Sequence, residues 1–158
     1  MIKQAVILAA GKGERLLPLT EKIPKPLLPI CNRSIIERMI DLLKGNGIEE
    51  IGVVINRRDY RYFSFLEKEV KLIQEDESKG TGWSVYSARN FIKDNFLLMY
   101  GDLVLDLDGF RDYLKLSPPV VFGYFVDDVS RYGKIEYENG KVREIKEKSE
   151  RGRGLINT

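Results

Sequence analysis

Runs of apolar residues divide the chain into alternating strands and helices. The first run, residues 3–9, holds Ala, Val, Ile and Leu without alternation, which is typical of a central parallel strand buried on both faces. Apolar runs at 49–55, 70–74 and 96–100 predict three more strands. Helical segments separate these runs, and strands that alternate with helices indicate a parallel sheet with crossover helices. We therefore expect an α/β, Rossmann-like fold with a mostly parallel sheet flanked by helices.

The helices are predicted from their start signals and their apolar spacing. Ser34 and Glu37 form a capping-box pattern, and the glycine-rich residues 45–47 end the segment that follows. Asp59 is expected to open a second helix, and Thr81 to cap a third. The apolar stripe of the first helix has the spacing of one helical face: Ile36, Met39, Ile40 and Leu43.

The last third of the chain has a different pattern. Residues 120–126 predict another apolar strand, and Asn139-Gly140 stands between the strand-like runs 134–137 and 142–145. Asn-Gly between such runs is a strong signal for a β-hairpin. The apolar phase slips by one residue in the second run, which predicts a bulge. With 158 residues and no linker or internal repeat, we expect one domain, 1–158, with a C-terminal β-hairpin.

Composition excludes several classes of function. There are 26 basic and 24 acidic side chains, so the surface lacks the excess positive charge of a nucleic-acid-binding protein. Without histidine, imidazole catalysis and histidine metal ligands are excluded. The single cysteine, Cys31, cannot form an internal disulfide, which fits a reducing compartment. No leader or membrane-length apolar run is recognised, so we expect a cytoplasmic protein with no membrane partner.

A glycine loop follows the first predicted strand. Gly11 and Gly13 have no Cβ, so the backbone can bend tightly and bring its N–H groups close to a ligand. Successive N–H groups in such a loop form a concave anion site. Lys12, Arg15 and Lys25 add three cations within a short segment. The stretch therefore predicts a site for a triphosphate.

Two common types of glycine loop do not fit this stretch. A Walker loop needs Ser or Thr after Gly-Lys, and here Gly13 follows Gly11-Lys12. A dinucleotide fingerprint needs a third glycine, and Leu16 occupies that position. A turn whose basic residues only face water is the structural alternative.

Polar residues follow three of the predicted parallel strands. The glycine loop follows the first, Gln74 with Gly80 and Thr81 follows the third, and Asp102 follows the fourth. Ligands of open parallel sheets bind outside the carboxyl ends of the strands. We therefore expect these segments to converge on one site.

Asp102 has the position of a Mg²⁺ ligand, because magnesium takes one or two protein carboxylates and fills its other positions with water and phosphate. The alternative is a carboxylate that caps a turn. Asp106 and Asp108 are interpreted as helix-start residues, where carboxylates are favoured.

A longer motif carries a family resemblance. Residues 11–20 read Gly-x-Gly-x-Arg-Leu-x-Pro-Leu-Thr, and Lys-Pro-Leu-Leu-Pro follows at 25–29. Together they resemble the signature of sugar-1-phosphate nucleotidylyltransferases of the NDP-sugar pyrophosphorylase type. Further matches lie at 80–82, 100–102 and 131–133. The resemblance implies a GT-A-like variant of the fold, and a reaction in which an NTP and a sugar 1-phosphate give an NDP-sugar and pyrophosphate, with Mg²⁺.

The resemblance also assigns roles by matching position. The catalytic residues it implies are Arg15, Lys25 and Asp102, with Asp102 as the metal ligand. The nucleotide-binding residues it implies are Ala10, Gly11, Lys12, Gly13, Gln74, Gly80 and Thr81. The residues it implies for the sugar phosphate are Gly133, Glu147, Lys148 and Asn157. The attacking sugar phosphate is already anionic, so catalysis needs positioning and charge stabilisation rather than a strong base.

The chain departs from the family pattern at several positions. Glu14 stands where the family has a small hydroxyl residue, and Gln74 is one residue farther from Gly80 than usual. Ser149 replaces a proline. Family members continue past residues 155–158, where a second acidic metal ligand normally follows. We therefore expect a C-terminally truncated chain, with a homo-oligomer as one way to cover its core.

Two alternative functions stay open. Residues 79–84 and the offset of Gln74 are compatible with a cytidylyltransferase for phosphocholine or inositol phosphate. The missing second carboxylate is compatible with a non-catalytic, nucleotide-binding or regulatory short form.

Overall fold

The structure is a computed structural model that describes residues 1–77, 79–104, 109–147 and 150–157. Its contacts divide into two compact units, unit 1 at Met1–Leu116 and unit 2 at Ser117–Thr158. A single nucleotidyltransferase domain over 1–158 stays a prediction. Within the described residues no helix has both the length and the apolar character needed to span a membrane.

Unit 1 is built on a parallel sheet, as predicted. Its strands are β1 (Gln4–Leu8), β4 (Glu50–Asn56), β5 (Lys71–Glu75) and β6 (Phe96–Tyr100), in the order β5-β4-β1-β6. β1 lies in the middle, with Leu8 opposite Val54 of β4 and Tyr100 of β6. Both faces of β1 are buried, which explains why its apolar residues do not alternate with polar ones.

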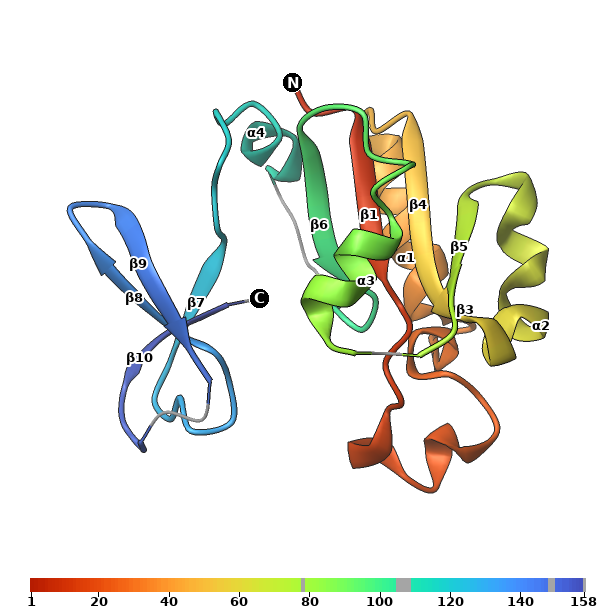
Figure 1. Cartoon of the computed structure of the whole chain (residues 1–158), viewed down its shortest axis with the longest axis horizontal. Coiled ribbons are helices and arrows are strands. Elements are labelled where there is room, and N and C mark those ends of the chain that lie inside the picture. Colours follow the sequence, from red (N-terminus) through yellow and green to blue (C-terminus); the bar gives the residue numbers. More distant parts are fainter. Residues whose placement is uncertain (78, 105–108, 148–149, 158) are drawn as a thin grey trace. The chain divides into compact units, whose positions relative to one another are not determined.

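Helices cover both faces of this sheet (Figure 1). α3 (Thr81–Ser87) packs against β1, β4 and β5, and α1 (Ile35–Gly45) lies on the opposite face. The capping box is confirmed, because the Ser34 N–H donates to the Glu37 carboxylate at 2.9 Å and the Glu37 N–H donates to Ser34 Oγ at 3.4 Å. The predicted apolar stripe of α1 is buried.

Two helix predictions were wrong in detail. Thr81 does not cap α3: the N-cap is Gly80, whose φ of 99° sets the entry into the helix without a side-chain cap. The helix expected from Asp59 is broken into α2 (Tyr60–Phe63) between the 3-10 helices Arg57–Asp59 and Ser64–Lys68.

Short elements connect these parts of unit 1. Three 3-10 helices, Glu14–Leu16, Leu19–Glu21 and Lys25–Leu27, carry the chain from the glycine loop to the small antiparallel pair β2 (Pro29–Ile30) and β3 (Arg33–Ser34). The unit also contains the one-turn helix α4 (Phe110–Tyr113).

Unit 2 is an antiparallel sheet in the order β7-β10-β8-β9. Its strands are β7 (Gly123–Val126), β8 (Lys134–Glu138), β9 (Lys141–Lys146) and β10 (Gly154–Asn157). β7 begins three residues later than expected, and β10 was not predicted.

The predicted hairpin is confirmed in β8 and β9. Asn139 and Gly140 have φ values of 52° and 72°, as a tight two-residue hairpin turn requires. The predicted bulge is present too, because Glu136 pairs with Glu144 whereas Tyr137 pairs with Val142.

Candidate functional site

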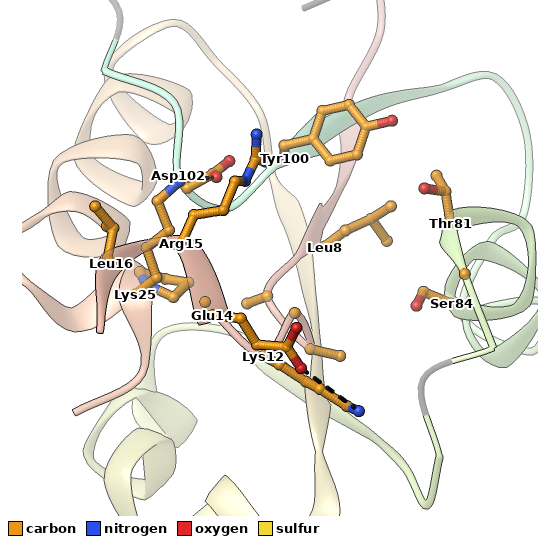
Figure 2. Close-up of a pocket in the computed structure, with 16 residues that line it drawn as sticks. Leu8, Lys12, Glu14, Arg15, Leu16, Lys25, Thr81, Ser84, Tyr100 and Asp102 are labelled. Carbon is orange, nitrogen blue, oxygen red and sulfur yellow. Dashed lines mark hydrogen bonds and ion pairs between the residues drawn. The ribbon is translucent and has the colours of Figure 1, made fainter. Parts of the chain in front are cut away.

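A cavity of about 570 Å³ opens at the carboxyl ends of β1 and β6 in unit 1. Its walls come from the glycine loop, the turn at Lys25, the first turn of α3 and the segment after β6 (Figure 2). The lining residues are 8–16, 25, 26, 80, 81, 84, 100 and 102. Three segments that the sequence predicted to converge therefore meet at one cavity.

The glycine loop is held by hydrogen bonds at both ends. Ala9 N–H still donates to the Val54 carbonyl at 2.8 Å, so the chain leaves the sheet only after this residue. Gly13 has a φ of 66°, and its carbonyl accepts hydrogen bonds from Leu16 N–H at 2.9 Å and from Thr20 Oγ1 at 2.8 Å. This left-handed conformation favours glycine and gives the loop its bend.

Gly101 brings the end of β6 against the end of β1. Its N–H donates to the Leu8 carbonyl at 2.8 Å, and a Cβ at this position would lie 2.9 Å from the same oxygen. The close approach places Asp102 at the cavity wall. Sequence reasoning did not assign a role to Gly101, although a glycine directly before the candidate metal ligand was a usable signal.

Ion pairs hold two of the three cations in the cavity. Lys25 Nζ lies 2.5 Å from Asp102 Oδ2, and both side chains are about one third exposed. Lys12 Nζ lies 3.8 Å from Glu14 Oε1 on a more exposed part of the wall. Arg15 makes no ion pair with any residue that the structure describes. An anion that enters the cavity can therefore bind the guanidinium of Arg15 directly. It can also replace the carboxylate partners of Lys12 and Lys25.

The residues present fit a magnesium site of the kind that uses one protein carboxylate. Magnesium is usually bound by one or two carboxylates, and substrate phosphates and water complete its shell. Asp102 supplies such a carboxylate next to the cations that would bind phosphate. Over the described parts of the chain, no group of three or more His, Cys, Asp or Glu side chains forms a protein-only metal cage.

Most of the predicted site residues of unit 1 lie together. Those that line the cavity are Ala10, Gly11, Lys12, Gly13, Arg15, Lys25, Gly80, Thr81 and Asp102. Gln74 does not line it: on β5 its side chain is exposed, whereas that of Glu75, on the opposite face, is buried. Sequence reasoning missed Ser84 and Tyr100, and the spacing of Ser84 one helical turn after Thr81 was the available signal.

Three residues predicted to bind the sugar meet within unit 2. Asn157 N–H donates to the Gly133 carbonyl at 3.0 Å. A Cβ on Gly133 would lie 2.5 Å from Asn157 Oδ1 and 2.9 Å from Glu147 Oε1, so both side chains close over this glycine. Lys148, Asp106 and Asp108 lie outside the described residues.

Comparison with known proteins identifies the class. The sequence model of the family described as nucleotidyl transferase matches residues 4–154. The match covers almost the whole chain. This chain belongs to the nucleotidyl transferase family.

Individual relatives carry related names. The chain is 36% identical to the bifunctional protein GlmU of Methanococcus maripaludis over 91% of its own length, but it spans only 35% of that relative. It is 31% identical to the D-glycero-alpha-D-manno-heptose 1-phosphate guanylyltransferase of Campylobacter jejuni, covering 98% of this chain and 72% of the relative. The solved structure of CTP:phosphocholine cytidylyltransferase (LicC) from Streptococcus pneumoniae matches with a TM-score of 0.80 and 29% identity, covering 99% of this chain and 71% of that one.

Proposed function

We propose that this chain transfers NMP from an NTP to a sugar 1-phosphate, giving an NDP-sugar and pyrophosphate. The observation that carries the proposal is the convergence of the glycine loop, three cations and Asp102 on one cavity. The name of the heptose 1-phosphate guanylyltransferase relative supports a sugar phosphate as the acceptor.

The glycine loop and its cations would bind the triphosphate. Backbone N–H groups near Gly11 and Gly13, with Lys12 and Arg15, provide donors and positive charge without any proton transfer. The acceptor is a phosphate anion that needs no deprotonation, so a chain without histidine can support the reaction. The main task of these residues is to hold two anions in line and to stabilise the charge that develops on the departing pyrophosphate.

Lys25 and Asp102 form the proposed catalytic pair. Asp102 would hold Mg²⁺, which supplies charge neutralisation at the reacting phosphates when bound. Lys25, released from Asp102, would then reach between the α-phosphate and the attacking sugar phosphate. The short ion pair keeps the ammonium group at the site before substrate binds.

The remaining assignments concern the two ends of the substrates. Thr81 and Gly80, on the α3 side of the cavity, are proposed to contact the base. The sugar phosphate is proposed to bind the unit 2 residues Gly133, Glu147, Lys148 and Asn157, and the side chains of Glu147 and Asn157 both lie against Gly133.

Pyrophosphate release tests the activity directly. The purified protein is incubated with Mg²⁺, each of the four NTPs and a panel of sugar 1-phosphates, and at least one combination should release pyrophosphate. Asp102→Asn should lower the rate by about 100- to 1,000-fold, the effect of removing one group that stabilises transition-state charge. Asp112→Asn is the matched control, because this exposed aspartate pairs with Lys115 at 2.7 Å and does not line the cavity. Activity of Asp102→Asn equal to that of the control, or no release with any pair, contradicts the proposal.

A second candidate is a cytidylyltransferase that acts on phosphocholine. The structural match to LicC favours it, since its TM-score is 0.80 over nearly the whole chain. Adding phosphocholine and inositol phosphate to the panel separates the two candidates, because preferential turnover of CTP with either acceptor would replace the sugar phosphate. Nucleotide binding without turnover would instead support the non-catalytic form.

A further inference from the structure

Ser84 differs from other buried polar side chains of unit 1. Gln4 bonds to Glu50 and to the Phe91 carbonyl, Ser34 is part of the cap of α1, and Asn56 accepts from the Arg58 N–H. Ser84 is only 5% exposed, yet its hydroxyl bonds to none of the residues that the structure describes. Its oxygen is not among the buried side-chain atoms of the described residues that lack a partner, so it is accessible from the cavity, where a ligand can bond to it.

The hydroxyl of Ser84 faces the cavity. Ser87 on the same helix donates to the Trp83 carbonyl at 3.1 Å, the usual way in which a helical serine satisfies its hydroxyl. Ser84 makes no such bond, and it lines the cavity one turn after Thr81. Figure 2 shows the oxygens of both side chains on the wall that α3 provides.

The two ends of the cavity differ in charge. Arg15, Lys25 and Asp102 lie together at one end, and Thr81 and Ser84 lie across from them with Leu8 between (Figure 2). In a nucleoside triphosphate the base is the part farthest from the terminal phosphates and carries no charge at neutral pH. Neutral hydroxyl groups beside an apolar side chain suit such a group better than they suit phosphate.

We propose that the Ser84 hydroxyl hydrogen-bonds to the nucleobase of the bound NTP and helps to select it. The inference rests on the proposed function, because it takes an NTP as the ligand of the cavity. A hydroxyl both donates and accepts, so Ser84 can pair with an amino or a carbonyl group on the edge of a base. Ser84 acts through contact with the nucleoside and has no part in phosphate binding.

Removal of the hydroxyl should affect the nucleotide complex and spare the free protein. Ser84→Ala removes a hydroxyl that opens on the cavity and has no partner among the described residues, and alanine is a better helix former than serine. The variant should therefore fold. A lost hydrogen bond should weaken binding of the preferred NTP by roughly 2- to 12-fold.

Calorimetric titration separates base contact from phosphate contact. Wild type, Ser84→Ala and the control Ser87→Ala are titrated with each of the four Mg²⁺–NTP complexes and with magnesium tripolyphosphate, which has no nucleoside. Ser84→Ala should lose affinity for the preferred NTP, lose a different amount for the others, and bind tripolyphosphate like wild type. Ser87→Ala should match wild type with every ligand.

Each other outcome has a defined meaning. If Ser84→Ala lowers the affinity for tripolyphosphate and for NTPs equally, Ser84 contacts the phosphates. If it lowers the affinity for all four NTPs equally and leaves tripolyphosphate unchanged, Ser84 contacts the ribose. If the affinity for NTPs does not change, Ser84 does not contact the nucleotide. All three overturn the Ser84 proposal while the proposed function stands. If wild type binds no NTP, the proposed function fails and the Ser84 proposal fails with it.

Discussion

The two sheets of this protein hold their candidate site residues in different ways. In the parallel sheet of unit 1, Ala5, Val6 and Ile7 of β1 are fully buried and the glycine loop follows this strand, while Asp102 follows the partly buried edge strand β6. In the antiparallel sheet of unit 2, all residues of β9 are exposed. The comparison shows that unit 1 positions its site at the ends of strands hydrogen-bonded into a core, whereas the Gly133 cluster combines one backbone hydrogen bond, from Asn157, with side chains that are partly or fully exposed.

The largest expected difference is in core packing. Ile7→Ala empties a fully buried position in β1 and should lower the free energy of unfolding by about 2–5 kcal/mol. Ile145→Ala on β9, where the side chain is 40% exposed, should cost about 1 kcal/mol or less. Urea unfolding followed by far-UV circular dichroism measures both, and the fluorescence of Trp83, the single tryptophan, reports on unit 1 separately. Equal costs at the two positions would remove the distinction between the sheets.

A smaller difference is expected between two glycines. Gly101→Ala directs a methyl group to 2.9 Å from the Leu8 carbonyl, so backbone must shift, and we expect a loss of about 1–3 kcal/mol together with weaker nucleotide binding. Gly133→Ala meets the ends of the Asn157 and Glu147 side chains, which can rotate away, so the stability loss should be smaller. Urea unfolding and NTP titration of both variants provide the measurement. A larger stability loss for Gly133→Ala would mean that its cluster is as rigid as the core.

The smallest effects concern two carboxylates and their dependence on pH. The Ser34 hydroxyl, and then the Ser34 N–H, lower the pKa of Glu37, and Lys146 lowers the pKa of Glu136. Both contributions to stability are therefore present above the ordinary glutamate pKa of about 4.3 and are lost as the pH falls through the lowered value. Ser34→Ala should cost about 1 kcal/mol at neutral pH.

Thermal unfolding between pH 7 and pH 3 tests this pair of sites. Glu37→Gln should lower the melting temperature at neutral pH and lose most of its effect at acidic pH. Glu136→Gln is the surface control, and its smaller effect should also fade with added salt because the side chains are exposed. A pH-independent effect of Glu37→Gln would show that the cap does not depend on the carboxylate charge.

Much of the fold was predictable because its signals are local. The buried run of β1, the capping box at Ser34 and the Asn139-Gly140 turn each encode an element within a few residues. The glycine loop and Asp102 were predictable as a site because the carboxyl ends of parallel strands share one edge of the sheet.

The features that sequence reasoning missed depend on contacts between distant segments. The need for glycine at position 101 comes from Leu8 on a neighbouring strand, and the isolation of the Ser84 hydroxyl is visible only once its surroundings are known. Gln74 was placed at the site from its sequence position, but it is exposed on the edge strand β5 and does not line the cavity. Thr81 was expected to cap α3, but the N-cap position is occupied by Gly80, and no side chain caps the helix.

The central position of β1 in the sheet limits local unfolding of the site. The strand is hydrogen-bonded to β4 along one edge and to β6 along the other, so it cannot fray while its neighbours remain in place. The glycine loop begins at the end of this strand, and Gly101 is tied to its last residue. Amide protons within β1 should exchange with solvent only when the whole of unit 1 unfolds. The amide proton of Ala9, where the glycine loop begins, should be protected to the same degree.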